Sequence, residues 1–159
     1  MITQDELKRL FHYDENTGLF TRLVKTSHNT HIGDIAGYID VYNTITINGK
    51  QYKAHRLVWL YVYGNFPINQ IDHINGVHTD NRIANLRECT NAENNRNKSI
   101  RSDNTSGYNG VTFIYCKWRA RCKINGVDII IGYYNSAIEA SVAYQDYTKL
   151  HYGEFYNGI

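Results

Sequence analysis

The sequence has few cysteines and no long apolar run, and both absences narrow the possible classes of protein. The three cysteines are odd in number and lack any C-x-x-C spacing, which argues against a disulfide framework and a zinc site built from four cysteines. No run of about 18 apolar residues is available to span a membrane. The first residues, MITQDELKRLF, carry acidic side chains where a secretion signal has basic ones. We therefore expect a cytoplasmic, intracellular protein without a membrane partner.

The chain also has little net charge, but its charges are unevenly distributed. The formal net charge is +2 over 159 residues, and hydrophobic residues make up 42% of the chain, as in ordinary globular proteins. Residues 50–101 carry eight basic and four acidic side chains, whereas residues 1–46 carry four and six. The length allows one ordinary domain or two small ones, and the middle of the chain is its basic part.

The first half of the chain is expected to form a scaffold. Thr3 is a helix cap, and the helix after it would carry Leu7, Leu10 and Phe11 on one face until a turn at residues 14–18. Alternating residues around Asn48-Gly49 predict a hairpin. The dense apolar run that begins at His55 and stops at Gly64 predicts a second helix.

The segment IDHINGVHTDNRIANLRECTNAENN, residues 71–95, combines an adjacent Asp and His with many asparagines. Seven of the chain's eighteen asparagines fall between residues 75 and 97. An apolar strand ending at the Asn75-Gly76 turn, a return strand ANLREC and a capping box Thr90-x-x-Glu93 predict the order strand, loop, strand, helix.

These residue types are suited to phosphodiester hydrolysis. A carboxylate such as Asp72, together with an amide oxygen such as that of Asn94, is sufficient to hold Mg²⁺, which prefers oxygen ligands and keeps several waters. A neutral imidazole, His73, can take a proton from the attacking water. Asn85 can fix the tautomer of His73 through a hydrogen bond. The alternative is that Asn and Asp gather here only to form turns and caps, with a half-exposed His73.

Other side chains near this segment have two interpretations. His55 is expected to pack or hydrogen-bond beneath the site rather than to act in catalysis, and His78 is either an ordinary exposed histidine or a residue near DNA. Three flanking arginines are candidates for holding phosphates, although the first of them can equally pair with Asp80. These arginines are Arg82, Arg87 and Arg96.

The last third of the chain is predicted to be a separate module. Residues 97–110 are polar and rich in Ser, Asn and Gly, as in a linker. Three strand-like runs follow, with an Asn125-Gly126 turn between the second and third. Ser136-x-x-Glu139 then opens a helix. We expect a three-stranded antiparallel sheet with one helix packed on it.

One strand of this module carries a row of cations. In CKWRARCKI, the period of two puts four basic residues on one face and Trp118 on the other. Like charges on one face repel each other, whereas a polyanion would be held by the whole row. A solvated strand face is the alternative. The four residues are Lys117, Arg119, Arg121 and Lys123.

The segments HRLVW and IDHINGVHTDNRIANLRECTNAENNRN resemble the HNH endonuclease family, in the form common in phage genomes and homing endonucleases. The resemblance extends upstream to LFHYDENTGLFTRL and AHRLVWLYVYGNFP. It implies a domain at residues 1–98 with a ββα-metal core at about 68–98. It also implies the site roles of four residues. These are Asp72 and Asn94 as metal ligands, His73 as the general base, and Asn85 as the residue that orients the base.

The final residue of the motif departs from the family. Asn94 stands where many members have a histidine, and an amide supplies only a neutral oxygen. Mg²⁺, or Mn²⁺ in its place, is therefore favoured over Zn²⁺ as the cofactor. Asn95 and Asn97 are neighbouring alternatives for this ligand.

The tail, SGYNGVTFIYCKWRARCKINGVDIIIGYYNSAIEASVAYQDYTKLHYGEF, resembles the plant APETALA2/ethylene-response DNA-binding domain. The resemblance implies a DNA-binding domain at residues 108–159, preceded by a linker at 99–107. In that family the sheet enters the major groove, so the same role is implied for Arg119, Arg121 and Lys123, with Lys117 in support.

The sequence therefore predicts an α+β protein that cuts double-stranded DNA. It would act as a monomeric, metal-dependent HNH endonuclease of the phage homing type, in the host cytoplasm if a phage encodes it. Two alternatives stay open. One is a DNA-binding regulator with a degenerate HNH unit, and the other is a nuclease for structured RNA.

Overall fold

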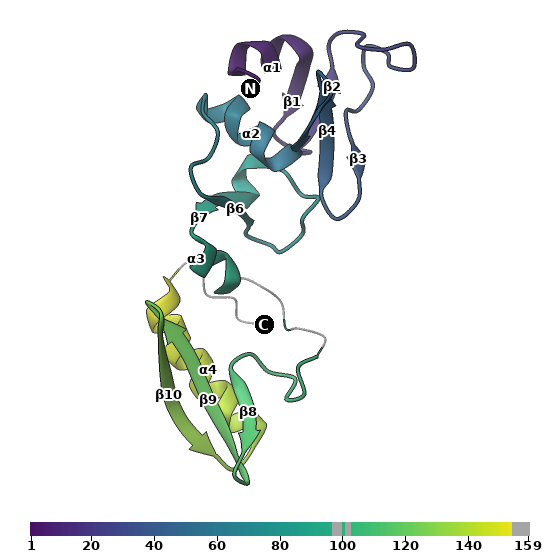
Figure 1. The fold of residues 1–159 in the computed structure, drawn as a ribbon. Coiled ribbons are helices and arrows are strands. Elements are labelled where there is room, and N and C mark those ends of the chain that lie inside the picture. The colour runs from purple at the N-terminus through teal and green to yellow at the C-terminus, as the bar shows by residue number, and fades with distance from the viewer. Residues whose placement is uncertain (97–99, 101–102, 154–159) are drawn as a thin grey trace. The chain divides into compact units, whose positions relative to one another are not determined.

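The computed structural model describes residues 1–96, 100 and 103–153 (Figure 1). The chain divides into two units, Met1–Asn94 and Asn95–Ile159. The described residues form helices and small antiparallel sheets, which confirms the predicted mixture of α and β structure. The domain boundary predicted at residue 98, part of the predicted linker (99, 101 and 102) and the predicted end of the second domain lie outside the described residues. Within the described part, no helix has the length and apolar character needed to cross a membrane.

The first unit opens with a capped helix and a hairpin. Helix α1, Gln4–Leu10, begins at the predicted cap, where Thr3 Oγ1 accepts a hydrogen bond from Glu6 N at 3.3 Å. Strand β1, Phe11–Asp14, follows at once and pairs antiparallel with β2, Leu19–Arg22. The prediction that Phe11 continues the helical face is wrong, because its backbone is already extended. Its ring is still buried and packs edge-on against Phe20.

The predicted hairpin and second helix are confirmed. Strands β3, Tyr38–Ile39, β4, Asn43–Ile47, and β5, Lys50–Lys53, form one antiparallel sheet in that order. The turn between β4 and β5 uses Asn48 and Gly49, both with positive φ, as a two-residue hairpin turn requires. Helix α2, Ala54–Tyr63, ends at Gly64, which has a φ of 82°. The Gly64 N–H donates a hydrogen bond to Leu60 O at 3.0 Å, which caps the C-terminus of the helix.

A single apolar core joins these elements. It is built from α1, β1, β2, β4 and α2, and Ile71 and Leu86, which lie later in the chain, also contribute to it. The largest of its fully buried apolar side chains are Leu7, Phe11, Phe20, Ile45, Leu57 and Val58. The helices and hairpins of the first half therefore form one support for the strands that follow.

Residues 70–96 form the predicted order of strand, loop, strand and helix. Strand β6, Gln70–His73, pairs antiparallel with β7, Leu86–Cys89, and a 3-10 turn, Ile83–Asn85, leads into β7. Helix α3, Asn91–Arg96, follows β7. The capping box at its start is confirmed, because Thr90 N donates to Glu93 Oε2 at 2.8 Å and Glu93 N donates to Thr90 Oγ1 at 3.3 Å.

The second unit contains the predicted three-stranded sheet and helix. Strands β8, Val111–Ile114, β9, Lys117–Ile124, and β10, Val127–Tyr134, are antiparallel, with β9 in the centre. Helix α4, Ala137–Tyr152, starts at its predicted cap, Ser136, and runs along the sheet (Figure 1). Its contact with the sheet buries a small core. The fully enclosed members of this core are Val111, Ala120 and Ala140.

A close backbone contact connects the β1–β2 hairpin to the loop before β7. Gly18, in the hairpin turn, has a φ of 73°, and a Cβ atom at this position would lie 2.5 Å from Arg82 N and 2.6 Å from the carbonyl carbon of Asn81. Only glycine fits both the backbone conformation and the space. The turn of the hairpin therefore supports residues 81–82 directly.

Replacing Gly18 with Ala tests this support, with Gly49→Ala as the matched control. Gly49 has almost the same φ, 74°, but a Cβ there would meet nothing within 4 Å. We expect Gly49→Ala to lower the free energy of unfolding by about 1–2 kcal/mol, the cost of the left-handed conformation. Gly18→Ala should lower it by a further ~1–3 kcal/mol, because the backbone at residue 82 has to move. Urea unfolding measures both variants, and equal losses would disprove the close contact.

Candidate active site

Asp72 and His73 occupy the last two positions of β6, and both side chains are buried. They are 6% and 3% exposed. In the register with β7, Asp72 lies opposite Arg87 and His73 lies opposite Leu86. Because successive side chains leave a strand on opposite faces, the two groups have different neighbours. A buried carboxylate and a buried imidazole need polar partners, and those partners define the site.

The Asp72 carboxylate is held by Arg87. Arg87 donates from Nε to Asp72 Oδ2 at 2.9 Å, and its Nη2 lies 2.8 Å from the same oxygen. The Arg87 side chain is only 13% exposed. The sequence made Arg87 a candidate for binding phosphate, whereas in the structure its guanidinium is bound within the protein. The pairing offsets the cost of burying the carboxylate and fixes its orientation.

His73 contacts Asn81, a residue that sequence analysis did not select. The Nε2 atom of His73 lies 3.1 Å from Asn81 Oδ1, and Asn81 is fully buried. Burial is the largest influence on His73 and lowers its pKa below the usual 6.5, while the hydrogen bond to Asn81 acts in the opposite direction. His73 is therefore mostly neutral at pH 7. The contact spans eight residues of irregular loop, so no periodic pattern in the sequence points to it.

Three further rings surround His73. The ring of His55 is perpendicular to that of His73, with 5.2 Å between the centroids, and the His78 centroid lies 5.8 Å from that of His73. Tyr42 stacks on His78 at 4.7 Å. Burial is the largest cause that lowers the pKa of His55, to about 3, and the neighbouring His73 also lowers it. Among the described residues no group hydrogen-bonds to Nδ1 of His55. This enclosure makes the surroundings of His73 poorly hydrated.

Asn85 shapes the loop between β6 and β7. Its Oδ1 accepts a hydrogen bond from Asn75 N at 3.0 Å, and its Nδ2 donates to Asn75 Oδ1 at 3.0 Å and to Asp80 O at 2.9 Å. Asn75 also accepts from Val77 N at 2.9 Å, which makes the predicted turn. These bonds place Asn85 at the base of the loop that carries Asn81.

The arginines near the loop have different surroundings. Arg82 pairs with Asp80, with 2.7 Å from Nε to Oδ1, which is the alternative that sequence analysis left open. This hydrogen bond is the largest cause that lowers the pKa of Asp80 to about 2. Arg96 ends α3, and its side chain lies outside the described part of the chain.

Of the two predicted metal ligands, Asp72 lies in β6 and Asn94 is hydrogen-bonded to the first residue of this strand. Asn94, in α3, donates from Nδ2 to Gln70 Oε1 at 2.7 Å, so its Oδ1 is the atom that could act as a ligand. Gln70 and Asp72 are two positions apart in β6 and share a face of the strand. Mg²⁺ needs only one or two protein oxygens, such as an Asp carboxylate and an amide. Within the described residues, no three His, Cys, Asp or Glu side chains form a site for a metal ion that needs more ligands. Asn97, an alternative to Asn94, lies outside the described residues.

In the second unit, the cations of β9 line the sheet face away from α4. Ala120 and Cys122 point to the buried side, whereas Lys117, Arg121 and Lys123 are exposed. Trp118 packs against the core and against Phe113, away from the cations, as the alternation predicted. The fourth cation, Arg119, is half-buried. Among the described residues no group accepts a hydrogen bond from its Nε.

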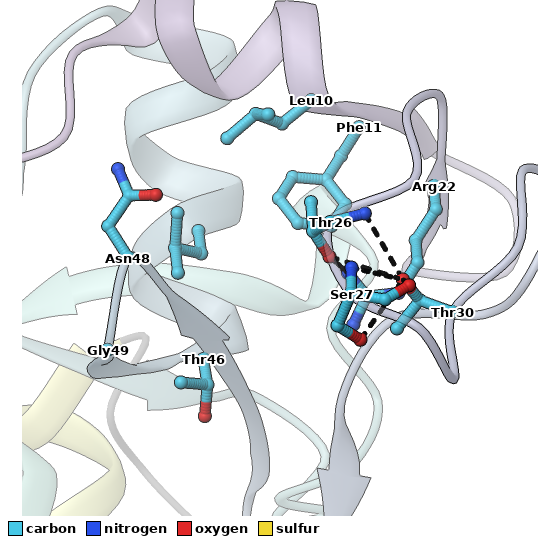
Figure 2. Close-up of a pocket in the computed structure, with 10 residues that line it drawn as sticks. Leu10, Phe11, Arg22, Thr26, Ser27, Thr30, Thr46, Asn48 and Gly49 are labelled. Carbon is cyan, nitrogen blue, oxygen red and sulfur yellow. Dashed lines mark hydrogen bonds between the residues drawn. The ribbon is translucent and has the colours of Figure 1, made fainter.

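The first unit also contains a cavity that lies apart from His73 and its neighbours. The residues that line it belong mainly to α1, the loop after β2 and the β4–β5 turn (Figure 2), and its volume is about 360 Å³. The hydroxyls that line it bond within the loop, as when Ser27 N donates to Thr30 Oγ1 at 3.0 Å and Arg22 Nη1 donates to Thr26 Oγ1 at 3.1 Å. None of the side chains around His73 lines this cavity.

Part of the chain matches a known protein family. Residues 52–96 match the family model described as HNH endonuclease. Neither a curated protein nor a solved structure matches the chain. The matched segment runs from β5 to α3 and includes Asp72, His73, Asn81, Asn85 and Asn94. The match supports an HNH nuclease with DNA-cleaving activity for the segment that contains the buried imidazole and carboxylate.

Proposed function

We propose that the protein is a metal-dependent endonuclease that hydrolyses phosphodiester bonds of double-stranded DNA. The main support is a buried, neutral His73 beside a buried carboxylate, both inside the segment that matches the HNH endonucleases. The finer assignments, to phage-encoded homing endonucleases that act as monomers in the host cytoplasm, rest on the resemblance described in the sequence analysis.

His73 is the proposed general base. Its enclosure holds the pKa below 6.5, so most molecules have an unprotonated ring at pH 7. An unprotonated ring can accept the proton of a water that attacks phosphorus. Because the ring is enclosed by its neighbours, its orientation is fixed before DNA binds.

Asp72 and Asn94 are the proposed ligands of the metal, Mg²⁺ or Mn²⁺. When bound, such an ion supplies Lewis acid chemistry that stabilises negative charge at the phosphodiester. Arg87 holds the Asp72 carboxylate in place, at the cost of partly neutralising its charge. A neutral amide as the second ligand adds no charge. We therefore expect the affinity for the metal to be weak.

The second unit is the proposed source of DNA affinity. Its support is the resemblance to the APETALA2/ethylene-response domain and the exposed cations on the free face of the sheet. Thr112 and Tyr133 flank Arg119 on the neighbouring strands, and Asp128 lies opposite Lys123. The basic residues of β9 therefore have mainly uncharged neighbours on the adjacent strands. Such a surface suits contact with phosphates and bases.

Replacing His73 with Ala tests the proposed reaction. Wild-type protein with Mg²⁺ should convert supercoiled plasmid to nicked circles, and His73→Ala should slow this by about 10²- to 10⁴-fold, the usual contribution of a general base. His12→Ala, which changes an exposed histidine of β1, should cut at the wild-type rate. Chelation of the metal should stop cutting.

Two outcomes of this assay would change the proposal. If the wild type shifts the mobility of DNA but never nicks it, the chain is a DNA-binding regulator instead. If a parallel digest shows that only structured RNA is cut, the substrate class is wrong.

The pH dependence of cleavage tests the state of His73. Because its pKa lies below 6.5, the base form predominates at pH 7 and is lost as the pH falls through that lowered value. The single-turnover rate should therefore change little from pH 8 to 7 and fall at lower pH, with its midpoint below 6.5. A midpoint above 6.5, or a rate unchanged down to pH 5, would contradict the assignment.

The role of the second unit is tested by changing Arg119 and Arg121 together to Ala. If each contacts one phosphate, the slope of log Kd against log salt concentration should fall by about 2. Cutting of saturating DNA should be retained, because the reacting groups are untouched. Lys8→Ala with Arg9→Ala removes two cations of α1 and is the matched control. A double variant of β9 that binds DNA with the wild-type salt dependence would rule out this surface.

A further inference from the structure

We propose that Asn81 is the positioning residue for His73, and that it selects the ring tautomer in which Nε2 carries the proton and Nδ1 is the base. This inference rests on the proposed function, because it states how the base of that site is set. It gives a specific role to a residue that the sequence analysis passed over.

The hydrogen bond between the two side chains defines the tautomer. His73 Nε2 lies 3.1 Å from Asn81 Oδ1. An amide oxygen can only accept, so Nε2 must donate, and in a neutral imidazole the lone pair is then on Nδ1. The orientation of the amide is supported independently. Asn81 Nδ2 faces Thr79 O at 3.4 Å, and a carbonyl can accept only from the nitrogen end of the amide.

The backbone of Asn81 is held from both sides. Tyr13 donates from its hydroxyl to Asn81 O at 3.0 Å and accepts from Ile83 N at 2.9 Å. Burial, the largest influence, raises the pKa of Tyr13 to about 12, so the hydroxyl keeps the proton that it donates. The turn at Gly18 lies against the backbone of residues 81–82. Tyr13 and Gly18 both belong to the β1–β2 hairpin, which lies outside the segment matched to the HNH endonucleases.

Asn81 and Asn85 therefore have separate tasks in the loop. Asn85 bonds to Asn75 and to the backbone of Asp80, which fixes the shape of the loop. Asn81, the next residue after Asp80, directs its side chain to the imidazole. A fully buried amide that faces a buried ring is a costly arrangement unless the hydrogen bond forms. The two side chains therefore hold each other in one orientation.

The first experiment reads the tautomer directly. The full-length protein, labelled with ¹⁵N at histidine, is studied at pH 8, where the ring is neutral. The ¹⁵N chemical shifts of the two ring nitrogens distinguish N–H from lone-pair nitrogen, and His73→Gln assigns the signals. We expect the Nε2–H tautomer in the wild type. An Nδ1–H tautomer in the wild type would overturn the proposal without any variant.

Variants of Asn81 then connect the tautomer to the rate. Asn81→Leu has a similar volume and no acceptor, so His73 should lose its tautomer preference. The single-turnover cleavage rate should fall about 10- to 100-fold with unchanged DNA affinity. Asn81→Asp restores an acceptor and should recover the Nε2–H tautomer and most of the rate. Asn65→Leu, at an exposed asparagine, is the control and should change neither.

The results distinguish this inference from the proposed function. An unchanged tautomer in Asn81→Leu, or a failure of Asn81→Asp to recover the Nε2–H signal, would overturn the positioning role. If the wild type has the expected tautomer, Asn81→Leu loses it and no DNA is cut, the positioning role stands and the endonuclease proposal fails. Because the wild-type spectrum is a test in itself, the proposal can be refuted even if Asn81→Leu does not fold.

Discussion

The loop between β6 and β7 must hold an imidazole that is withdrawn from water, and the polar contacts of the site follow from that constraint. A buried ring loses the hydration of its two nitrogens, so the protein has to supply partners or leave the ring neutral. Both occur here, since His73 has a lowered pKa and a hydrogen bond to Asn81. Hydrogen bonds from the protein restrict the loop. Asn85 bonds to Asn75 at its start and to Asp80 in its middle, and the Tyr13 hydroxyl bonds to the backbone of residues 81 and 83. The scaffold in the first half of the chain therefore determines the geometry of the site.

Features that depend on neighbouring residues were predictable from the sequence. The caps at Thr3, Thr90 and Ser136 and the turn at Asn48-Gly49 are recognisable because their donors and acceptors lie within four residues of each other. The placement of Asp72 and His73 at the end of a strand followed from the apolar residue before them and the Asn-Gly turn after them. Such signals involve few possible partners, so the residue types are sufficient to identify them.

The remaining contacts of the site could not be predicted, because their partners are distant in the sequence or compete with one another. Tyr13 and Asn81 are 68 residues apart, and only the packing of the hairpin brings them together. Asn81 and Asn85 lie in the same polar loop and have the same side chain, so residue type cannot decide which one meets His73. Arg87 looked available for phosphate, but the register of β6 with β7 places it opposite Asp72. A shift of one residue would have given a different pair.

Under the proposed function, the buried charged groups would serve catalysis and the exposed ones would serve DNA binding. The Asp72–Arg87 pair and His73 are enclosed, which makes each interaction strong and geometrically fixed, but limits the number of phosphates that these groups can reach. The exposed cations of β9 make weaker individual contacts, because solvent screens them. Each contact with a phosphate still adds affinity, because it releases counterions from the DNA. Affinity for a long polyanion therefore requires a row of exposed cations. Proton transfer requires only one correctly placed base, and placing the two tasks on separate units avoids burying the charges that are needed for binding.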